Sequence, residues 1–481
     1  MSTYLSYLQS IYFSKAAGKL YLCRLLIKVF VIFKTCNPDF ITKTIMLQNF
    51  FKTVVFLCLV LTSSCSSAQK TPHPVLVKSS PEKAGMSEDM FKQMDAAAAE
   101  FLKQTQNPGV IGFIARNGKV VYQQAIGYDD MEAKTPLEED AIMRIASQTK
   151  AVTSVGIMML FEEKKFLLDD PISKYLPAFR NPTVLVKFNP QDTTYTTKPA
   201  QTEITIRQLL THTSGISYPT IGTREATAIY AKAGIPSGIG TPNGKLADAM
   251  NKLGKLPLMH QPGEKFTYGL STDVLGYLIE VVSGQPLDVF FRTRIFEPLG
   301  MKDTYFYLPQ EKQNRLAILY TEDANHKTEK VTASKHPINP NYPKVAGTYF
   351  SGGAGLSSTI QDYAIFLQML LNEGEYNGKR LLRPETVQLM GTNQIGDVNN
   401  GDDKFGLGFG ITSAKTAARL GVSEGNLEWG GIFGTTYWID RKTGIIALLY
   451  SQKYPNSYGS IGDKFKSFVY QAITDKKEKV K

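Results

Sequence analysis

The most regular pattern of apolar positions lies in residues 144–166, RIASQTKAVTSVGIMMLFEEKKF. Val152, Val155, Met158 and Met159 recur there near helical spacing, which predicts a buried amphipathic helix. A pattern this long and this apolar is typical of a core helix. We therefore expect the rest of the chain to be arranged around it.

Alternating apolar and polar positions predict strands toward both ends of the chain. Residues 109–128 alternate around Asn117-Gly118, a strong hairpin signal, and follow a predicted helix over residues 87–104. Residues 428–452 are predicted to form two strands joined by a turn, with a closing helix over 465–473. Strands from both ends with helices between them predict an α/β (α+β) fold, in which an antiparallel sheet is flanked by helices and a mainly helical domain is inserted.

Helical patterns fill the middle of the chain. Four helices are predicted there, at residues 204–216, 246–253, 272–283 and 357–372. Polar residues 180–202 predict a surface insertion, and residues 301–350 show no regular pattern. The stretch 217–244 is polar and rich in Gly and Ala, so we expect it to form a loop over a pocket.

Composition is that of a globular protein, with 43% hydrophobic and 20% charged residues in 481. The net charge is +11, and residues 1–68 supply more than half of it through seven Lys or Arg and one Asp. The remaining surplus is scattered, without a basic stripe, so no nucleic-acid partner is expected. All four cysteines (Cys23, Cys36, Cys58, Cys65) lie in this leader, which excludes cysteine catalysis and a disulfide framework from the rest of the chain.

Residues 46–68, MLQNFFKTVVFLCLVLTSSCSSA, combine a lysine, a short apolar core and a small-residue end. This pattern predicts a bacterial secretory signal peptide that is too short to span a membrane. Two outcomes stay open: cleavage before Gln69, or acylation of Cys65 in a loose lipobox, which would tether the protein to a membrane. We expect an exported protein, either periplasmic or a membrane-anchored lipoprotein.

The two ends of the chain lie outside this scheme. Residues 1–45 precede the signal and are interpreted as an over-called N-terminus with Met46 as the true start; a membrane anchor is the alternative. Residues 477–481 form a basic tail.

Ser147 and Lys150 lie one helical turn apart at the start of the long helix. The positive end of a helix dipole favours an oxyanion there, and a serine beside a lysine suggests an activated nucleophile. The pair alone is weak evidence, because Ser67–Lys70 and Ser80–Lys83 share the spacing and serine is a preferred helix cap. An ordinary cap beside a solvated lysine is the alternative.

Further motifs favour the nucleophile. Ser147-Gln-Thr-Lys150, ITIRQLLTHTSGI at 204–216, PGEKFTYGLSTDVLGYLIEVVSG at 262–284 and Trp429-Gly430-Gly431 occur in one order. Together they resemble the serine β-lactamase/penicillin-binding-protein superfamily, specifically its class C-related esterase branch (family VIII carboxylesterases). The resemblance covers about residues 77–473.

The resemblance implies a β-lactamase/DD-peptidase-like fold for a serine hydrolase domain at residues 69–476. Its α/β part would comprise about 77–145 and 350–476, and its helical part about 146–349.

The resemblance also implies a role for each matching residue. Ser147 would be the acylated nucleophile, Lys150 would accept its proton, and Tyr268 would act with the lysine as general base and acid. The oxyanion hole would be the backbone N–H groups of Ser147 and Ile432. Gly430-Gly431 would let the acyl group approach the strand closely.

Three literal motif matches are rejected on their position. Lys442-Thr443-Gly444 spells the lactamase KTG triad but lies in a predicted turn, and Trp429-Gly430-Gly431 fills the corresponding strand instead. Tyr454-Pro455-Asn456 spells Tyr-x-Asn but follows the Gly-rich strand, so Tyr268-Gly269-Leu270 is the better match. Ser423 sits in a Gly-x-Ser-x-Gly sequence that lies in a polar loop, not at a strand-to-helix turn.

Trp429 and Leu270 stand where β-lactamases use a lysine and an asparagine to hold their substrates. An apolar, aromatic wall suits ester acyl chains, and Tyr218 is expected to line the same pocket unless it is a packing residue. We therefore expect a serine hydrolase that cleaves carboxylic esters and by the same chemistry transesterifies. A β-lactamase or D-amino-acid peptidase/carboxypeptidase acting on cell-wall-like amides, and an inactive binding homologue, are the alternatives.

The expected partner is accordingly a small-molecule ester or β-lactam-like substrate. No metal or cofactor is expected, because the five histidines are scattered without ligand spacing. The oligomeric state stays open.

Overall fold

The computed structural model describes residues 73–334, 336–457 and 461–475. The predicted signal peptide, Cys65, residues 1–45 and the basic tail at 477–481 lie outside the described residues. Their processing and the proposed limits of the domain therefore stay predictions.

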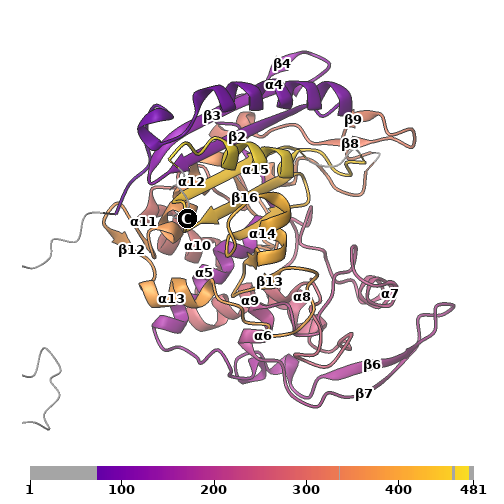
Figure 1. The fold of residues 1–481 in the computed structure, drawn as a ribbon. Helices are drawn as coiled ribbons and strands as arrows, with labels where there is room; N and C mark the ends of the chain where they lie inside the picture. The colour runs from indigo at the N-terminus through magenta and orange to yellow at the C-terminus, as the bar shows by residue number, and fades with distance from the viewer. Residues whose placement is uncertain (1–72, 335, 458–460, 476–481) are drawn as a thin grey trace, which may run out of the picture. The chain divides into compact units, whose positions relative to one another are not determined.

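A nine-stranded sheet joins the two ends of the described chain, as the indigo and yellow strands of Figure 1 show. Its order is β1-β3-β2-β17-β16-β15-β14-β13, with β4 paired to β3. The strands are β1 (Val77–Lys78), β2 (Gly109–Arg116), β3 (Lys119–Asp130), β4 (Thr135–Pro136), β13 (Lys404–Phe405), β14 (Gly410–Ile411), β15 (Leu427–Gly431), β16 (Thr435–Asp440) and β17 (Ile445–Tyr450). Only β1–β3 pairs in parallel, so the predicted antiparallel sheet is confirmed.

Turn chemistry sets the hairpins of this sheet. Asn117 and Gly118, at φ 50° and 78°, close β2 and β3 as predicted. Lys442-Thr443-Gly444 lies in the turn between β16 and β17, which confirms that it is not the lactamase strand motif. The prediction of two strands in 428–452 was wrong, because Gly434 takes φ 91° and its N–H bonds to Gly431 O, so the chain reverses between β15 and β16.

Helices cover both faces of the sheet. Alternate side chains of β2 separate the two sides. Val110 and Ile114 pack with α4 (Glu88–Thr105) and α15 (Gly462–Gln471), and Ile111 and Phe113 pack into the core that contains α12 (Ile360–Leu371). The sheet is therefore buried between two helical layers.

The central helix is α5 (Thr149–Glu162), which packs on α9 (Ser271–Ser283). The expectation of an amphipathic helix was wrong, because every residue from Thr149 to Leu160 is buried. Two of its threonines make hydrogen bonds inside the core. Thr153 donates a hydrogen bond to Gly352 O, and Thr149 accepts one from the Leu356 N–H.

The other elements complete the helical part and the periphery. The helices are α6 (Ile206–Leu210), α7 (Arg224–Lys232), α8 (Leu246–Leu253), α10 (Leu287–Phe291), α11 (Glu297–Leu299), α13 (Pro384–Met390) and α14 (Ala414–Leu420). The strands are β5 (Met143–Arg144), β6 (Thr183–Phe188), β7 (Tyr195–Pro199), β8 (Tyr320–Glu322), β9 (Thr328–Lys330), β10 (Ser357–Ser358), β11 (Glu375–Tyr376) and β12 (Lys379–Arg380).

Several predicted bounds shift for local reasons. The helix expected over 204–216 is only α6, because a Thr205–Gln208 capping box starts it and His212, at φ 55°, follows its end. The insertion at 180–202 forms the exposed hairpin β6–β7, which extends from the body in Figure 1. The helix expected from 357 starts at Ile360, because Thr359 is its cap.

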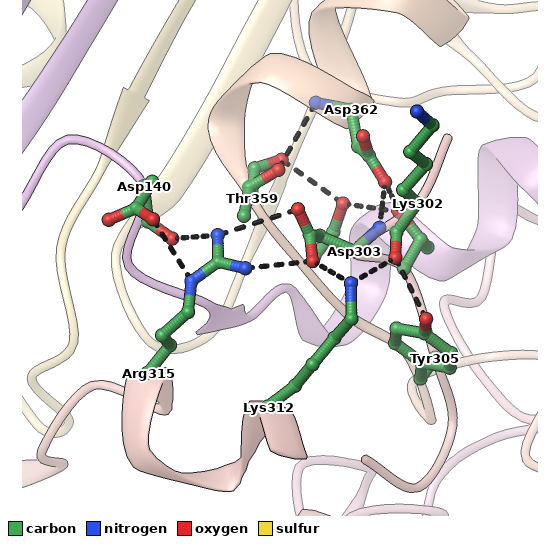
Figure 2. Close-up of polar contacts among 10 residues, drawn as sticks. Asp140, Lys302, Asp303, Tyr305, Lys312, Arg315, Thr359 and Asp362 are labelled. Atoms are coloured by element: carbon green, nitrogen blue, oxygen red, sulfur yellow. Dashed lines mark hydrogen bonds and ion pairs between the residues drawn. The ribbon is translucent and has the colours of Figure 1, made fainter. Parts of the chain in front are cut away.

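Charged side chains fix the start of the irregular 301–350 segment to α12 (Figure 2). Asp303 accepts from Lys312 at 2.5 Å and from Arg315 at 2.9 Å. Asp362 on α12 in turn accepts from the Asp303 N–H at 2.6 Å and from Thr304 at 2.9 Å. Buried apolar side chains along the segment, among them Phe306, Leu319 and Tyr349, add to this network.

Among the described residues, no single helix has the length and apolar character needed to cross a membrane. Ser271–Ser283 and Leu287–Leu299 reach them only as a pair bent by 82°. Both helices of that pair contribute to the main core.

Candidate active site

Ser147 lies in a one-turn 3₁₀ segment, Ala146–Gln148, immediately before α5. Gln148, not Ser147, is the N-cap residue of α5, so the capping alternative does not describe this serine. Ala146 takes φ 42°, a conformation that non-glycine residues rarely adopt and that is held here by full burial. The strained turn presents the Ser147 hydroxyl to a cavity.

Lys150 lies one turn further on and is 3% exposed. Its Nζ lies within hydrogen-bond distance of three oxygens: Gly353 O at 2.7 Å, Tyr218 Oη at 2.8 Å and Ser147 Oγ at 3.2 Å. The two residues that the sequence placed one helical turn apart are therefore in hydrogen-bond contact. The lysine is held by three oxygens rather than solvated.

Tyr268 joins this group through its ring. Lys150 Nζ lies 4.7 Å from the Tyr268 ring centroid, and the phenolic oxygen accepts a hydrogen bond from Trp429 Nε1 at 3.2 Å. The phenol bonded to the lysine is that of Tyr218, whose role the sequence left open between pocket wall and packing. Burial first, and then the neighbouring Tyr268 and Asp273, raise the pKa of Tyr218 well above its usual value.

The His212 ring packs against the Tyr268 ring. Its ring centroid is 4.8 Å from that of Tyr268, and Phe266 and Phe405 pack edge-on against it. Burial and the charge of Lys150 lower the pKa of His212 well below its usual value, so the ring is neutral. Its Nδ1 has no hydrogen-bond partner among the described residues. This contact with Tyr268 was not visible in the sequence.

The Gly-rich strand closes against the serine turn. A Cβ at Gly431 would lie 2.3 Å from Ile145 O and 2.4 Å from Thr435 Oγ1, so only glycine lets β15 pass this close to the turn. Gly430 and Ile432, on either side, line the same cavity as Ser147. The structure thus brings together the two residues expected to supply the oxyanion hole.

The cavity has a volume of about 420 Å³, which suits a small organic ligand. Its lining residues are Ser147, Tyr218, Thr220, Ile221, Ser237, Ile239, Tyr268, Ala354, Trp429, Gly430 and Ile432. The loop expected over a pocket, residues 217–244, supplies five of them. Sequence reasoning missed the individual residues Thr220, Ile221, Ser237 and Ile239, because a polar loop carries no periodic signal.

Two expected substrate contacts are absent from this lining. Leu270 is fully buried at the N-terminus of α9 and packs into the main core, so placing it in the substrate wall was wrong. Gly431 makes its close contact with the serine turn rather than with the cavity. Ser423 lies in the loop between α14 and β15 and also outside the cavity lining.

Comparison with known proteins assigns the chain to a family. A family model described as Beta-lactamase matches residues 94–467. Protein Rv1367c of Mycobacterium tuberculosis (strain ATCC 25618 / H37Rv) is 33% identical over 362 residues, which are 72% of this chain and 86% of that protein. The chain belongs to the β-lactamase family.

Some relatives of this β-lactamase-family chain are described as esterases or hydrolases. Esterase EstB of Burkholderia gladioli is 28% identical over 394 residues, covering 79% of this chain and 94% of that protein. The solved structure of EstCE1, a hydrolase with promiscuous acyltransferase activity, has a TM-score of 0.67 at 26% identity, covering 80% of this chain and 99% of that chain. The predicted superfamily and fold class are confirmed, and the protein is a serine hydrolase.

Proposed function

We propose that this chain hydrolyses carboxylic esters through an acyl-enzyme formed on Ser147. The observation that carries the proposal is the contact of Ser147 Oγ with Lys150 Nζ at 3.2 Å beside a largely apolar cavity. Aromatic and aliphatic side chains dominate its walls, and none of the lining residues is charged. Such a cavity favours neutral acyl and alkoxy groups over a substrate carboxylate.

In the proposed reaction, Ser147 Oγ attacks the ester carbonyl carbon while its proton passes to Lys150 Nζ. The N–H groups of Ser147 and Ile432 stabilise the negative charge that develops on the carbonyl oxygen. Tyr268 delivers a proton to the departing alkoxide, which leaves as the alcohol. A water molecule then attacks the acyl-enzyme and gives a proton back to Tyr268. Lys150 returns its proton to Ser147 Oγ as the serine leaves, which releases the carboxylic acid and restores the free enzyme.

Tyr218 and Gly353 hold the lysine during these steps. Their oxygens lie 2.8 and 2.7 Å from Lys150 Nζ and leave the third contact of the amine for Ser147. An amine fixed in this way reaches the serine proton without a search through side-chain rotamers. Trp429 holds the Tyr268 hydroxyl in place through its indole N–H.

Acyl transfer to an alcohol is the second candidate. EstCE1, to which the chain is similar, is described as a hydrolase with promiscuous acyltransferase activity. The cavity of about 420 Å³ leaves room for an alcohol beside a short acyl group, and an alcohol that replaces water regenerates Ser147 with a new ester as product. A mixture of a vinyl ester and an alcohol tests this directly, because only acyl transfer yields the new ester.

The test of the main proposal compares a chromogenic short-chain ester with a chromogenic cephalosporin. We expect ester turnover, little cephalosporin turnover, and an acyl mass added to Ser147 in intact-protein mass spectrometry. Rapid cephalosporin hydrolysis with inert esters would favour the β-lactamase or D-amino-acid peptidase alternative. Inertness to both substrates, with no fluorophosphonate labelling of Ser147, would favour a binding homologue.

We also propose that the protein is exported, in a periplasmic or lipid-anchored form. The support is the signal-like pattern of residues 46–68. Cell fractionation of the wild type and of Cys65→Ala separates the forms. A membrane-bound wild type that becomes soluble in the variant indicates acylation at Cys65, whereas cytoplasmic retention of both proteins contradicts export.

A further inference from the structure

A buried carboxylate that the proposed steps do not use lies next to the catalytic lysine. Asp273, in the first turn of α9, is fully buried. Its Oδ1 accepts a hydrogen bond from Ser351 Oγ at 2.6 Å. Because Ser351 Oγ itself accepts from the Ala354 N–H at 3.0 Å, the serine hydrogen points to the carboxylate. The second oxygen, Oδ2, has no hydrogen-bond partner among the described residues.

One turn, from Ser351 to Gly355, contacts both Asp273 and Lys150. Gly355 N–H bonds to Ser351 O and closes the turn, and Gly353 O within it accepts from Lys150 Nζ at 2.7 Å. A Cβ at Gly353 would lie 2.3 Å from Asp273 Oδ2 and 3.5 Å from Lys150 Nζ. The carboxylate and the amine therefore lie against the same α-carbon.

The pocket loop packs on this turn as well. A Cβ at Gly238 would lie 2.4 Å from Ser351 Oγ, and the preceding Ser237 lines the substrate cavity. The Ser351–Asp273 hydrogen bond thus lies between α9, the Gly-rich turn and the cavity wall. A carboxylate in this position influences the amine through both geometry and charge.

The charge of Asp273 acts on a group of titratable neighbours. Burial raises the pKa of the Asp273 carboxyl, and the Ser351 hydrogen bond and the charge of Lys150 act in the opposite direction. Asp273 in turn contributes to raising the pKa of Tyr218 and of Tyr349. The titratable groups packed around Lys150 Nζ and the Asp273 carboxylate are Tyr218, Tyr268, His212 and Tyr349.

We propose that Asp273 is a positioning residue for the Ser147 reaction: it fixes the Gly353 carbonyl against Lys150 and places a buried negative charge behind the amine. This inference rests on the proposed acylation of Ser147. It assigns a role in the chemistry to a carboxylate that touches neither substrate nor nucleophile.

Removal of the Asp273 charge should shift the pH–rate profile in a predictable direction. A negative charge stabilises a protonated amine and also opposes ionisation of a phenol. Loss of the Asp273 charge therefore favours the deprotonated form of the group that accepts the serine proton, whether that group is an amine or a phenol. The acidic limb of the pH–rate profile should move to lower pH in either case.

Asp273→Asn keeps the shape of the side chain and removes the charge. We expect the acidic limb of the fluorophosphonate labelling rate of Ser147 to move down by about half a pH unit or more. We expect the plateau rate to fall about tenfold as the Gly353 carbonyl loosens. Ser351→Ala keeps the charge and deletes the hydrogen bond, so its rate should fall about threefold or more without that downward shift.

Asp362→Asn is the matched control. Asp362 is also buried and accepts from a backbone N–H and a threonine hydroxyl, but its partners are Asp303 and Thr304 in the segment of Figure 2. This variant should be less stable to heat while its labelling profile stays that of the wild type.

Two outcomes each overturn the inference. One is an Asp273→Asn profile that coincides with the wild-type profile, and the other is an unchanged labelling rate in Ser351→Ala. If Asp273→Asn does not fold, the Ser351→Ala rate alone decides. Failure of the proposed function shows itself differently, as a wild-type protein that neither hydrolyses esters nor is labelled at Ser147.

Discussion

Lys150 donates a 2.8 Å hydrogen bond to the hydroxyl of Tyr218, whereas it meets Tyr268 through the face of the ring, 4.7 Å from its centroid. The site therefore contains two phenols with different relationships to one amine. Tyr218 is bonded directly to the lysine and is 4% exposed. Tyr268 lines the cavity with its hydroxyl held by Trp429. This division suggests different kinetic consequences for the loss of each hydroxyl.

Tyr268→Phe should lower the acylation rate by about 100- to 10,000-fold, the range typical for loss of a general acid or base. The phenyl ring keeps the packing against His212, so the fold should be retained. Stopped-flow release of the alcohol from a chromogenic ester measures acylation. A rate within a factor of a few of the wild type would show that Tyr268 handles no proton.

Tyr218→Phe should have the smaller effect, about 10-fold on kcat/KM, because the lysine keeps its Gly353 and Ser147 contacts. The same ester assay applies, with Tyr230→Phe as a control. Tyr230 is also buried and accepts a hydrogen bond from Ser217 N–H outside the cavity lining, so its loss should affect stability more than rate. A Tyr218→Phe effect larger than that of Tyr268→Phe would exchange the two roles.

Lys150→Ala should lower acylation by several orders of magnitude, because in the proposed mechanism Ser147, Lys150 and Tyr268 act as one proton-transfer unit. The measurement is the mass increase of the protein with time after mixing with ester. Lys164→Ala, an exposed lysine just beyond α5, should label at the wild-type rate. Near-normal acylation of Lys150→Ala would contradict the proposed base.

Local patterns in the sequence were sufficient for the β2–β3 hairpin and for the contact between Ser147 and Lys150. The Asn117-Gly118 turn fixes one hairpin by its own backbone preference, and Ser147 and Lys150 meet because helical geometry stacks such spacings. The order of motifs then identified the family. These features depend on neighbours along the chain, which is why they could be predicted.

Features set by tertiary contact could not be predicted in this way. Leu270 immediately precedes α9 and lies in the core. A leucine has the same apolar side chain in a core as in a pocket wall, so the sequence could not distinguish the two positions. Gly353 and Asp273 reach Lys150 from positions more than a hundred residues away, through a turn with no motif of its own. The division of 427–440 into two strands depends on a single glycine turn inside an apolar run.

Trp429→Ala should raise KM for esters with bulky acyl groups and affect acetate esters least, because it removes an apolar wall of the cavity. Trp429→Phe should keep most of that wall but lose the indole hydrogen bond to Tyr268, lowering kcat by about 5-fold. Steady-state kinetics over a series of acyl lengths measures both effects. Equal losses for every acyl length in Trp429→Ala would place the acyl group elsewhere.

Acid should destabilise the protein partly through a buried ion pair far from the serine turn in the sequence. Glu322 Oε1 lies 2.9 Å from Lys453 Nζ, and both side chains are almost fully buried. Burial alone would raise the pKa of Glu322, but hydrogen bonds from Ser457 and Lys453 outweigh it and bring the pKa to about 2. Since this folded-state pKa is below the unfolded value near 4.5, the pair stabilises the protein above pH 4.5, and that stability is lost as the pH falls toward 2.

Glu322→Gln should therefore lower the free energy of unfolding at neutral pH by about 3 kcal/mol, because it removes one charge of a buried ion pair. Urea unfolding at a series of pH values measures this loss, and the variant should show a weaker decline in stability between about pH 4.5 and pH 2. Asp402→Asn, which breaks the exposed pair with Lys415, should change stability by less than about 1 kcal/mol. Equal effects of the two substitutions would show that burial of the Glu322–Lys453 pair does not determine its contribution.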